Sequence, residues 1–253
     1  MSGSLATAFM TNSEQHHANQ KRGLNNNEVN KKRCVILKKL DSELKTAGDK
    51  TVILSGEFIS SPGFNEDELA KLCEFIMSRG RSITAVGYIR SPKSFMESAF
   101  LERVKGGQDV FILKNLHPKY RKRFEKLERL LGRENVHYWK FDPASFPNHC
   151  VVQDFCMRMG IDINPSNITR FNESLSLPAL ALLYAYRKYG PGYGRGPSAI
   201  PDNDQLIQRL EELPGIKLRF HSSQIKPIFD EYHNHIKWME DRIGHSFEES
   251  LTK

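Results

Sequence analysis

A short apolar stretch that ends at glycine, followed by a helical pattern, constrains the fold of this chain most. Residues 51–55 read Thr-Val-Ile-Leu-Ser and stop at Gly56, and β-branched residues bounded by glycine are typical of a buried strand. Apolar residues then recur at helical spacing over 66–79, until Gly80. The pattern predicts a strand, a crossover helix and a stop, with the carboxylate of Glu57 at the carboxyl end of the strand.

A second strand is predicted over residues 82–89, and it runs directly into Arg90. Ser91 is placed to cap a helix that has Pro92 at its first position. Ser98 follows Ser91 by about two helical turns, so the two residues share a helix face. We therefore expect Arg90, the free amides of the helix start and Ser98 to converge on one anion.

The rest of the chain alternates helical and extended patterns. Further helices are predicted over 28–47, 117–131, 148–159, 178–189, 202–213 and 224–243, and a third strand over 135–141. Strands that alternate with helices indicate an α/β protein: a three-layer, mostly parallel sheet flanked by helices, with a helical C-terminal part. The polar segment 1–27 holds few apolar residues and is predicted to be disordered, which leaves 28–253 as a single domain.

Composition limits the class of protein more than it limits the function. The 253 residues are 39% hydrophobic and 26% charged, no apolar run is long enough to span a membrane, and no signal peptide is apparent. Four cysteines without paired or metal-ligand spacing indicate reduced thiols, and we expect a cytoplasmic protein without a metal. The formal net charge of +7 favours anionic partners: nucleic acid, a phosphorylated cofactor, an acidic polysaccharide or a membrane surface.

One predicted helix carries much of the positive charge. Its cations are Lys119, Arg121, Lys122, Arg123, Lys126 and Arg129. Such a run is most simply a solvated face. The alternative, a nucleic-acid-binding helix, ranks last, because Tyr120 and Phe124 are its only aromatic residues for base stacking.

Several of these segments resemble one family. Arg90 and Ser98, at a junction between strand and helix, resemble the 3′-phosphate motif of sulfotransferases that use 3′-phosphoadenosine 5′-phosphosulfate. Five short segments are similar in sequence to bacterial sulfotransferase-like proteins of polysaccharide modification: 52–57, 88–92, 104–107, 154–155 and 172–176. The resemblance covers roughly residues 51–189, and the order of its short motifs carries its specificity.

The resemblance implies a function and a role for each matching residue. Arg90 and Ser98 would hold the 3′-phosphate of the nucleotide, and Asn172 and Ser174 would line its pocket. Glu57 would be the base that takes the proton from the acceptor hydroxyl. The implied reaction transfers a sulfuryl group from 3′-phosphoadenosine 5′-phosphosulfate to a carbohydrate hydroxyl, with no metal, and no nucleic-acid partner is expected.

The sequence departs from the family at its beginning. Members begin with a strand and a lysine-containing phosphate loop, and nothing over residues 1–50 matches either. The Gly-rich stretch 190–197 lacks lysine, so it is a poor substitute. It stays open whether the chain is an active sulfotransferase or a degenerate, amino-terminally shortened protein that binds nucleotides or polyanions without catalysis.

Local alternatives also stay open for the candidate site residues. Glu57 would equally cap a turn or pair with a surface arginine. Arg90 and Ser98 would equally be a sheet-edge cation and a serine bonded back to its own helix. The sequence predicts neither the acceptor nor the oligomeric state.

Overall fold

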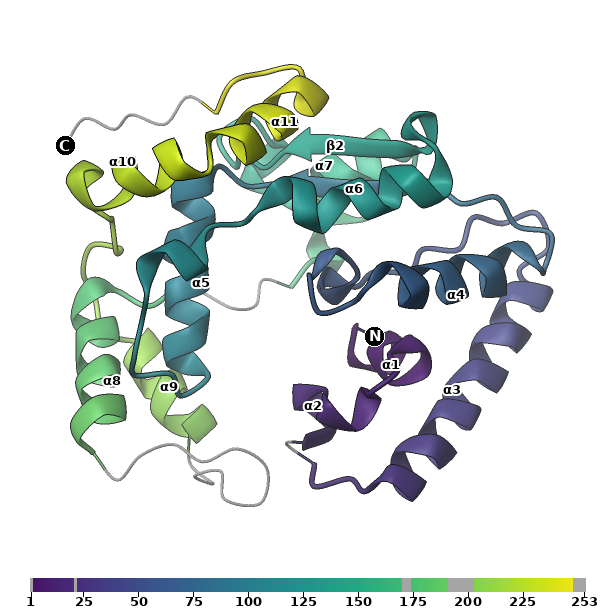
Figure 1. Cartoon of the computed structure of the whole chain (residues 1–253), viewed down its shortest axis with the longest axis horizontal. Helices are drawn as coiled ribbons and strands as arrows, with labels where there is room; N and C mark the ends of the chain where they lie inside the picture. The colour runs from purple at the N-terminus through teal and green to yellow at the C-terminus, as the bar shows by residue number, and fades with distance from the viewer. Residues whose placement is uncertain (1, 21, 170–173, 191–202, 248–253) are drawn as a thin grey trace. The chain divides into compact units, whose positions relative to one another are not determined.

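The chain is mostly helical. The computed structural model (Figure 1) describes residues 2–20, 22–169, 174–190 and 203–247. Its helices are α1 (Ser2–Phe9), α2 (His17–Gln20), α3 (Asn26–Thr46), α4 (Glu66–Met77), α5 (Pro92–Lys105), α6 (Tyr120–Leu131), α7 (Val151–Arg158), α8 (Leu177–Tyr189), α9 (Asn203–Glu211), α10 (Ser222–Glu231) and α11 (His233–Ile243). The strands in the described residues are β1 (Ala85–Ile89) and β2 (Val136–Lys140), which pair in parallel.

The predicted three-layer α/β fold is wrong. Helix accounts for 62% of the described residues and strand for 4%, so the two-stranded sheet is too small to separate two layers of helices. The main error is the stretch 51–55, which has no regular secondary structure. Ile53 is 45% exposed there, whereas a strand at the centre of a parallel sheet is buried on both faces. A run of β-branched residues indicates extended chain but does not supply a neighbouring strand.

Most of the other predicted elements are confirmed within a few residues. The stretch 82–89 forms β1 over Ala85–Ile89, and 135–141 forms β2 over Val136–Lys140. The single helix predicted over 224–243 is instead two helices, α10 and α11. The backbone of Tyr232 departs from helical values between them, with φ −104° and ψ 18°. Hydrophobic periodicity continues across this break, which is why the sequence pattern misses it.

Helices also form in the polar segment 1–27. Leu5, Ala6 and Phe9 of α1 are buried, and α1 contacts α3. Arg33 of α3 donates hydrogen bonds to the carbonyl oxygens of Thr7 (3.1 Å) and Met10 (2.6 Å), at the end of α1 where helix carbonyls lack partners within the helix. The prediction of disorder considered only the few apolar residues within 1–27. Arg33, which binds the carbonyl oxygens at the end of α1, lies outside that segment.

Contacts divide the chain into two compact units. The first unit holds the described parts of Met1–Ala85 and Tyr120–His137, and the second those of Val86–Lys119, Tyr138–Gly192 and Asp202–Lys253. The division passes through both strands of the sheet. Our prediction of one domain over 28–253 is not tested by this division and stays a prediction.

Helix α5 organises the core of the second unit. Its residues Leu101 and Val104 pack in a cluster with residues of α8 and α9, and Met96 packs in another cluster with Ile225 and Ile228 of α10. Beside Met96, the buried carboxylate of Glu97 accepts hydrogen bonds from the amide of Phe220 (3.0 Å) and from Arg219 (2.7 Å). Both apolar packing and a charged group therefore fix the segment before α10 against α5.

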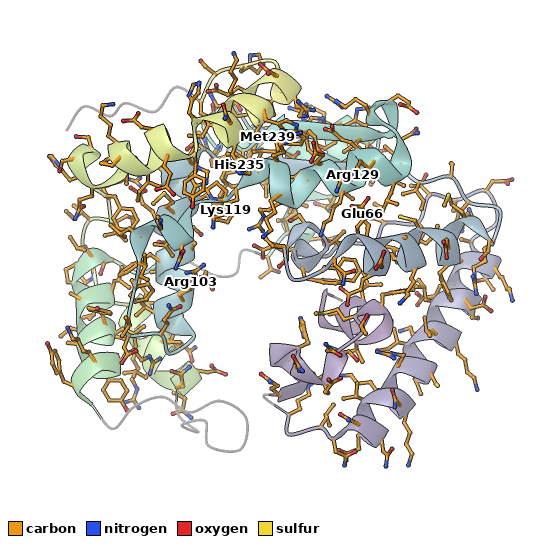
Figure 2. The ribbon with its side chains drawn as sticks, viewed as in Figure 1. Glu66, Arg103, Lys119, Arg129, His235 and Met239 are labelled. Atoms are coloured by element: carbon orange, nitrogen blue, oxygen red, sulfur yellow. The ribbon has the colours of Figure 1, made fainter. Side chains whose placement is uncertain are left out.

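A buried histidine lies near the break between α10 and α11. His117 is 4% exposed, and its ring stacks on that of Tyr232 at a centroid distance of 4.5 Å. Its Nδ1 accepts a hydrogen bond from the backbone amide of Lys119 (3.0 Å). Burial lowers the pKa of His117 to about 3, and the nearby positive charges of His235 and Lys119, both marked in Figure 2, lower it further. The folded protein therefore keeps this imidazole neutral.

We expect the stability of the protein to fall when the pH drops from 7 to 5. The unfolded chain binds a proton at His117 near pH 6.5, and the folded chain does not bind it until about pH 3. Acidification over this range thus favours the unfolded state, by about 2 kcal/mol in the free energy of unfolding. Urea unfolding of the protein and of His117→Gln at pH 7, 6 and 5 measures this loss.

The His117→Gln variant should lose most of the pH dependence, whatever its stability at pH 7. A matched control is His233→Gln, which removes an exposed histidine of α11 and should leave the dependence unchanged. If all three proteins lose stability equally between pH 7 and pH 5, the assignment to His117 is wrong.

Candidate functional site

The candidate site lies where β1 and β2 end. In a parallel pair the carboxyl ends of both strands lie at one edge of the sheet, where open α/β sheets bind ligands. The backbone amide of Phe141, just after β2, donates a hydrogen bond to the carbonyl oxygen of Ile89 at the end of β1 (2.8 Å). The guanidinium of Arg90 lies over the ring of Phe141, with its central carbon 4.6 Å from the ring centroid. Arg90 is thus held at the sheet end by an aromatic neighbour that the sequence analysis did not link to it.

Helix α5 begins directly after Arg90. Ser91 is its N-cap residue and Pro92 occupies its first position, as predicted. The side chain of Ser91 makes no capping hydrogen bond, although serine is among the residues that usually do so. The start of α5 therefore keeps its partial positive charge beside a guanidinium, an arrangement that favours an anion.

Ser98 lies within α5 and is half-buried, and its hydroxyl makes no hydrogen bond with the described residues. The alternative of a serine bonded back to its own helix is therefore not what the structure contains. A rise of 1.5 Å per residue places Ser98 about 10 Å along the helix axis from Ser91. This separation exceeds the size of one phosphate group, so a phosphate at Arg90 contacts either the helix start or Ser98 and not both.

A buried carboxylate ties β1 to α7 on the face of the sheet that carries Tyr88. Asp154, 2% exposed, accepts hydrogen bonds at Oδ2 from the hydroxyl of Tyr88 and from Nε of Arg158 (2.6 Å). Burial alone would raise the pKa of Asp154, but the hydrogen bonds from Arg158 and Tyr88 outweigh it and lower that pKa. Burial and the same hydrogen bond raise the pKa of Tyr88. Tyr88 and Asp154 are far apart in the sequence, and no local pattern links them.

The other candidate residues are Glu57, Ser174 and Asn172, of which the structure describes the first two. Glu57 is exposed, begins the short helix Glu57–Ser60 in the first unit, and does not follow a strand as predicted, because 51–55 is irregular. Burial lowers the pKa of Arg123, and the negative charge of Glu57 opposes this change, so the two side chains interact electrostatically. Ser174 lies in the second unit, where its carbonyl oxygen accepts a hydrogen bond from Lys217. Asn172 lies outside the described residues.

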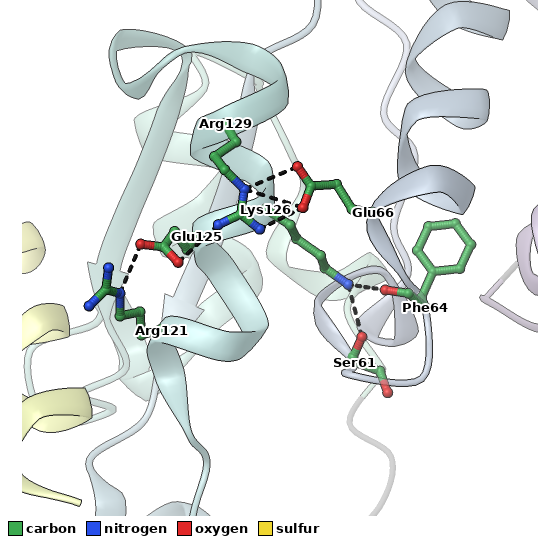
Figure 3. A network of polar contacts seen from close by, with 7 residues as sticks. All are labelled: Ser61, Phe64, Glu66, Arg121, Glu125, Lys126 and Arg129. Atoms are coloured by element: carbon green, nitrogen blue, oxygen red, sulfur yellow. Dashed lines mark hydrogen bonds and ion pairs between the residues drawn. The ribbon is translucent and has the colours of Figure 1, made fainter.

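The cations of α6 are largely engaged within the first unit, as Figure 3 shows. Lys126, 5% exposed, donates to the carbonyl oxygens of Ser61 (2.9 Å) and Phe64. Arg129 pairs with Glu66 of α4 (2.5 Å) and with Glu125 (2.9 Å). The interpretation of this run as a solvated face is therefore wrong for Lys126, and the nucleic-acid alternative loses cations that it needs. Burial lowers the pKa of Lys126 to about 8, and the charge of Arg123 adds to the effect.

Comparisons with models of protein families, with curated proteins and with solved structures find no match to this chain. The described residues contain no group of three or more His, Cys, Asp or Glu side chains placed to hold a metal ion. Within the same residues, every helix is too short or too polar to cross a lipid bilayer.

We expect Lys126→Met to destabilise the protein by about 2 kcal/mol, because it leaves two buried carbonyl oxygens without the charged donor that binds them. Arg121→Ala, which breaks an exposed pair with Glu125 on the same helix, should cost about 0.5 kcal/mol or less. Urea unfolding monitored by circular dichroism compares the two variants. Equal and small losses would show that Lys126 is not the structural residue we describe.

Proposed function

We propose that this chain binds the 3′-phosphate of a 3′-phosphoadenosine nucleotide at Arg90 and the start of α5. We propose further that it transfers a sulfuryl group from 3′-phosphoadenosine 5′-phosphosulfate to a carbohydrate hydroxyl. The observation that carries the proposal is a guanidinium held over Phe141, directly before a helix start that its own serine does not cap. The proposal uses β1, Arg90 and α5, and does not depend on a three-layer sheet.

The chemistry of a phosphate monoester suits this junction. Arginine presents several N–H donors in a fixed plane and binds phosphate oxygens in pairs. The contact with the Phe141 ring restricts the orientations of the guanidinium, so less conformational entropy is lost when a phosphate binds. Ser98, whose hydroxyl has no partner among the described residues, lies farther along the same helix and is the donor that the resemblance implies. These features support the binding half of the proposal.

The transfer half rests on the resemblance. A sulfuryl transfer needs a base near the acceptor hydroxyl and cations near the departing phosphate. Glu57 is exposed and is the base that the resemblance implies. In the second candidate function the chain binds the nucleotide without transferring the sulfuryl group. It is favoured by one observation: the described part of residues 1–50 forms helices α1, α2 and α3, where the family has a strand and a phosphate loop.

We expect adenosine 3′,5′-bisphosphate to bind more tightly than adenosine 5′-monophosphate, because only the former carries the 3′-phosphate. Arg90→Ala should weaken binding of the bisphosphate by about ten- to a hundredfold, as expected for the loss of charged hydrogen bonds. It should change binding of the monophosphate little, so the preference between the two nucleotides disappears. Isothermal titration calorimetry measures both affinities, and the shift of the melting temperature at saturating nucleotide provides a second measurement.

Arg121→Ala is the matched control, since it removes the same charge from an exposed position in the other unit and should leave both affinities unchanged. Transfer of radiolabelled sulfate that Glu57→Gln abolishes, with nucleotide affinity intact, would support catalysis. Nucleotide binding without transfer to any carbohydrate would support the second candidate. No calorimetric heat and no melting shift at saturating bisphosphate would overturn both.

A further inference from the structure

A cavity of about 590 Å³ lies beside β2 in the second unit, and Arg90 is not part of its wall. Its lining combines cations, a carboxylate, hydroxyls and aromatic rings: Tyr138, Trp139, Lys140, Asp142, Ser145, Arg158, Ile243, His245 and Ser246. The volume falls within the range that small-molecule sites occupy. Neither the resemblance nor the proposed function assigns a role to this cavity.

Arg158 presents a fixed guanidinium to the cavity. Its Nε donates to the buried carboxylate of Asp154 (2.6 Å), and its central carbon lies 4.9 Å from the ring centroid of Trp139. The side chain is nevertheless 41% exposed. The hydrogen bond to Asp154 uses Nε, and the hydroxyl of Tyr88 also interacts with the guanidinium. The terminal amino groups carry four N–H donors, more than this one hydroxyl can accept, so donors remain for a ligand. Because Asp154 binds its Nε and Trp139 packs against its plane, the guanidinium has a fixed orientation and can bind two oxygens of an oxyanion.

Lys140 adds a second cation to the same wall. It is the last residue of β2 and is half-buried, and its ammonium makes no hydrogen bond or ion pair with the described residues. A half-buried ammonium without a carboxylate partner is uncommon, because burial weakens its hydration. Lys140 and Arg158 together therefore favour an oxyanion at this side of the cavity.

Asp142 adds a negative charge to the lining of the cavity. One of its oxygens accepts a hydrogen bond from the amide of Ala144 (3.2 Å), and the hydroxyl of Ser145 donates to its backbone carbonyl (2.8 Å). A carboxylate only accepts hydrogen bonds, so it suits ligand hydroxyls and repels a bare inorganic anion. The cavity thus combines donors for an oxyanion with acceptors for hydroxyl groups.

We infer that this cavity binds a monosaccharide-sized sugar that carries an oxyanion group: a carboxylate, a sulfate or a phosphate. Arg158 and Lys140 bind the oxyanion, and Asp142 accepts hydrogen bonds from the sugar hydroxyls. The inference stands apart from the proposed function, since it uses neither Arg90 nor a nucleotide.

The experiment titrates the full chain with five probes by isothermal titration calorimetry. Glucuronate, glucose 6-sulfate and glucose 6-phosphate test the three oxyanions, while glucose and inorganic sulfate each supply only half of the recognised chemistry. We expect at least one charged sugar to bind at least about tenfold more tightly than glucose and than inorganic sulfate. The order among the three charged sugars identifies the oxyanion.

Two variants assign the binding to the cavity. Lys140→Gln should weaken the charged sugars by about tenfold, and its matched control Lys114→Gln, which removes an exposed charge in the same unit, should not. Asp142→Asn keeps the side-chain oxygen that accepts from Ala144. This variant should bind the charged sugars more weakly, and its affinity for inorganic sulfate should stay the same or increase. Circular dichroism confirms that each variant is folded.

The inference is overturned if none of the charged sugars binds better than glucose, or if inorganic sulfate binds as tightly as they do. It is also overturned if Lys140→Gln and Lys114→Gln behave alike. Arg90→Ala should leave sugar binding intact while it impairs the nucleotide, so the two proposals fail separately.

Discussion

One buried carboxylate sets the positions of the groups on which both proposed sites depend. Asp154 accepts hydrogen bonds from Tyr88 on β1 and from Arg158 on α7, and a charge so far from water is tolerated only when its oxygens are satisfied. The ring of Tyr88 packs in turn against those of Trp139 and Phe141. Phe141 lies under the guanidinium of Arg90, and Arg158 lies over Trp139. At the end of the small sheet, aromatic rings therefore surround a buried, hydrogen-bonded carboxylate.

Charged side chains make comparable ties elsewhere in both units, and most of their partners are backbone atoms. Lys126 binds two carbonyl oxygens in the first unit. In the second unit Glu97 accepts from the amide of Phe220, and Arg187 donates to the carbonyl oxygens of Val104 (3.2 Å) and Lys105 at the end of α5. Irregular segments and helix ends expose backbone groups that no regular ladder satisfies. With only two strands in the described residues, these side chains take over part of the role that strand pairing has in a larger sheet.

The sequence predicts what depends on local signals and fails where a distant partner decides. Periodicity locates α4 and α5, and a serine followed by proline marks the start of α5, so the place of Arg90 between strand and helix is confirmed. The irregular stretch 51–55 has strand composition, but no strand in the described part of the chain pairs with it. The partnership of Tyr88 with Asp154, and the burial of Lys126 within a charged run, depend on segments distant in the chain. Neither leaves a pattern in its own window.

Helix α1, in the polar segment 1–27, packs into the core of the first unit. The ring of Phe9 meets that of Phe75 in α4 at a centroid distance of 5.6 Å, and Arg33 of α3 binds the carbonyl oxygens at the end of α1. Clipping these residues by a protease, or crowding them with a purification tag, would uncover apolar surface on two other helices and leave a guanidinium without its acceptors. A product cut near residue 10 would therefore be prone to aggregate rather than simply shorter.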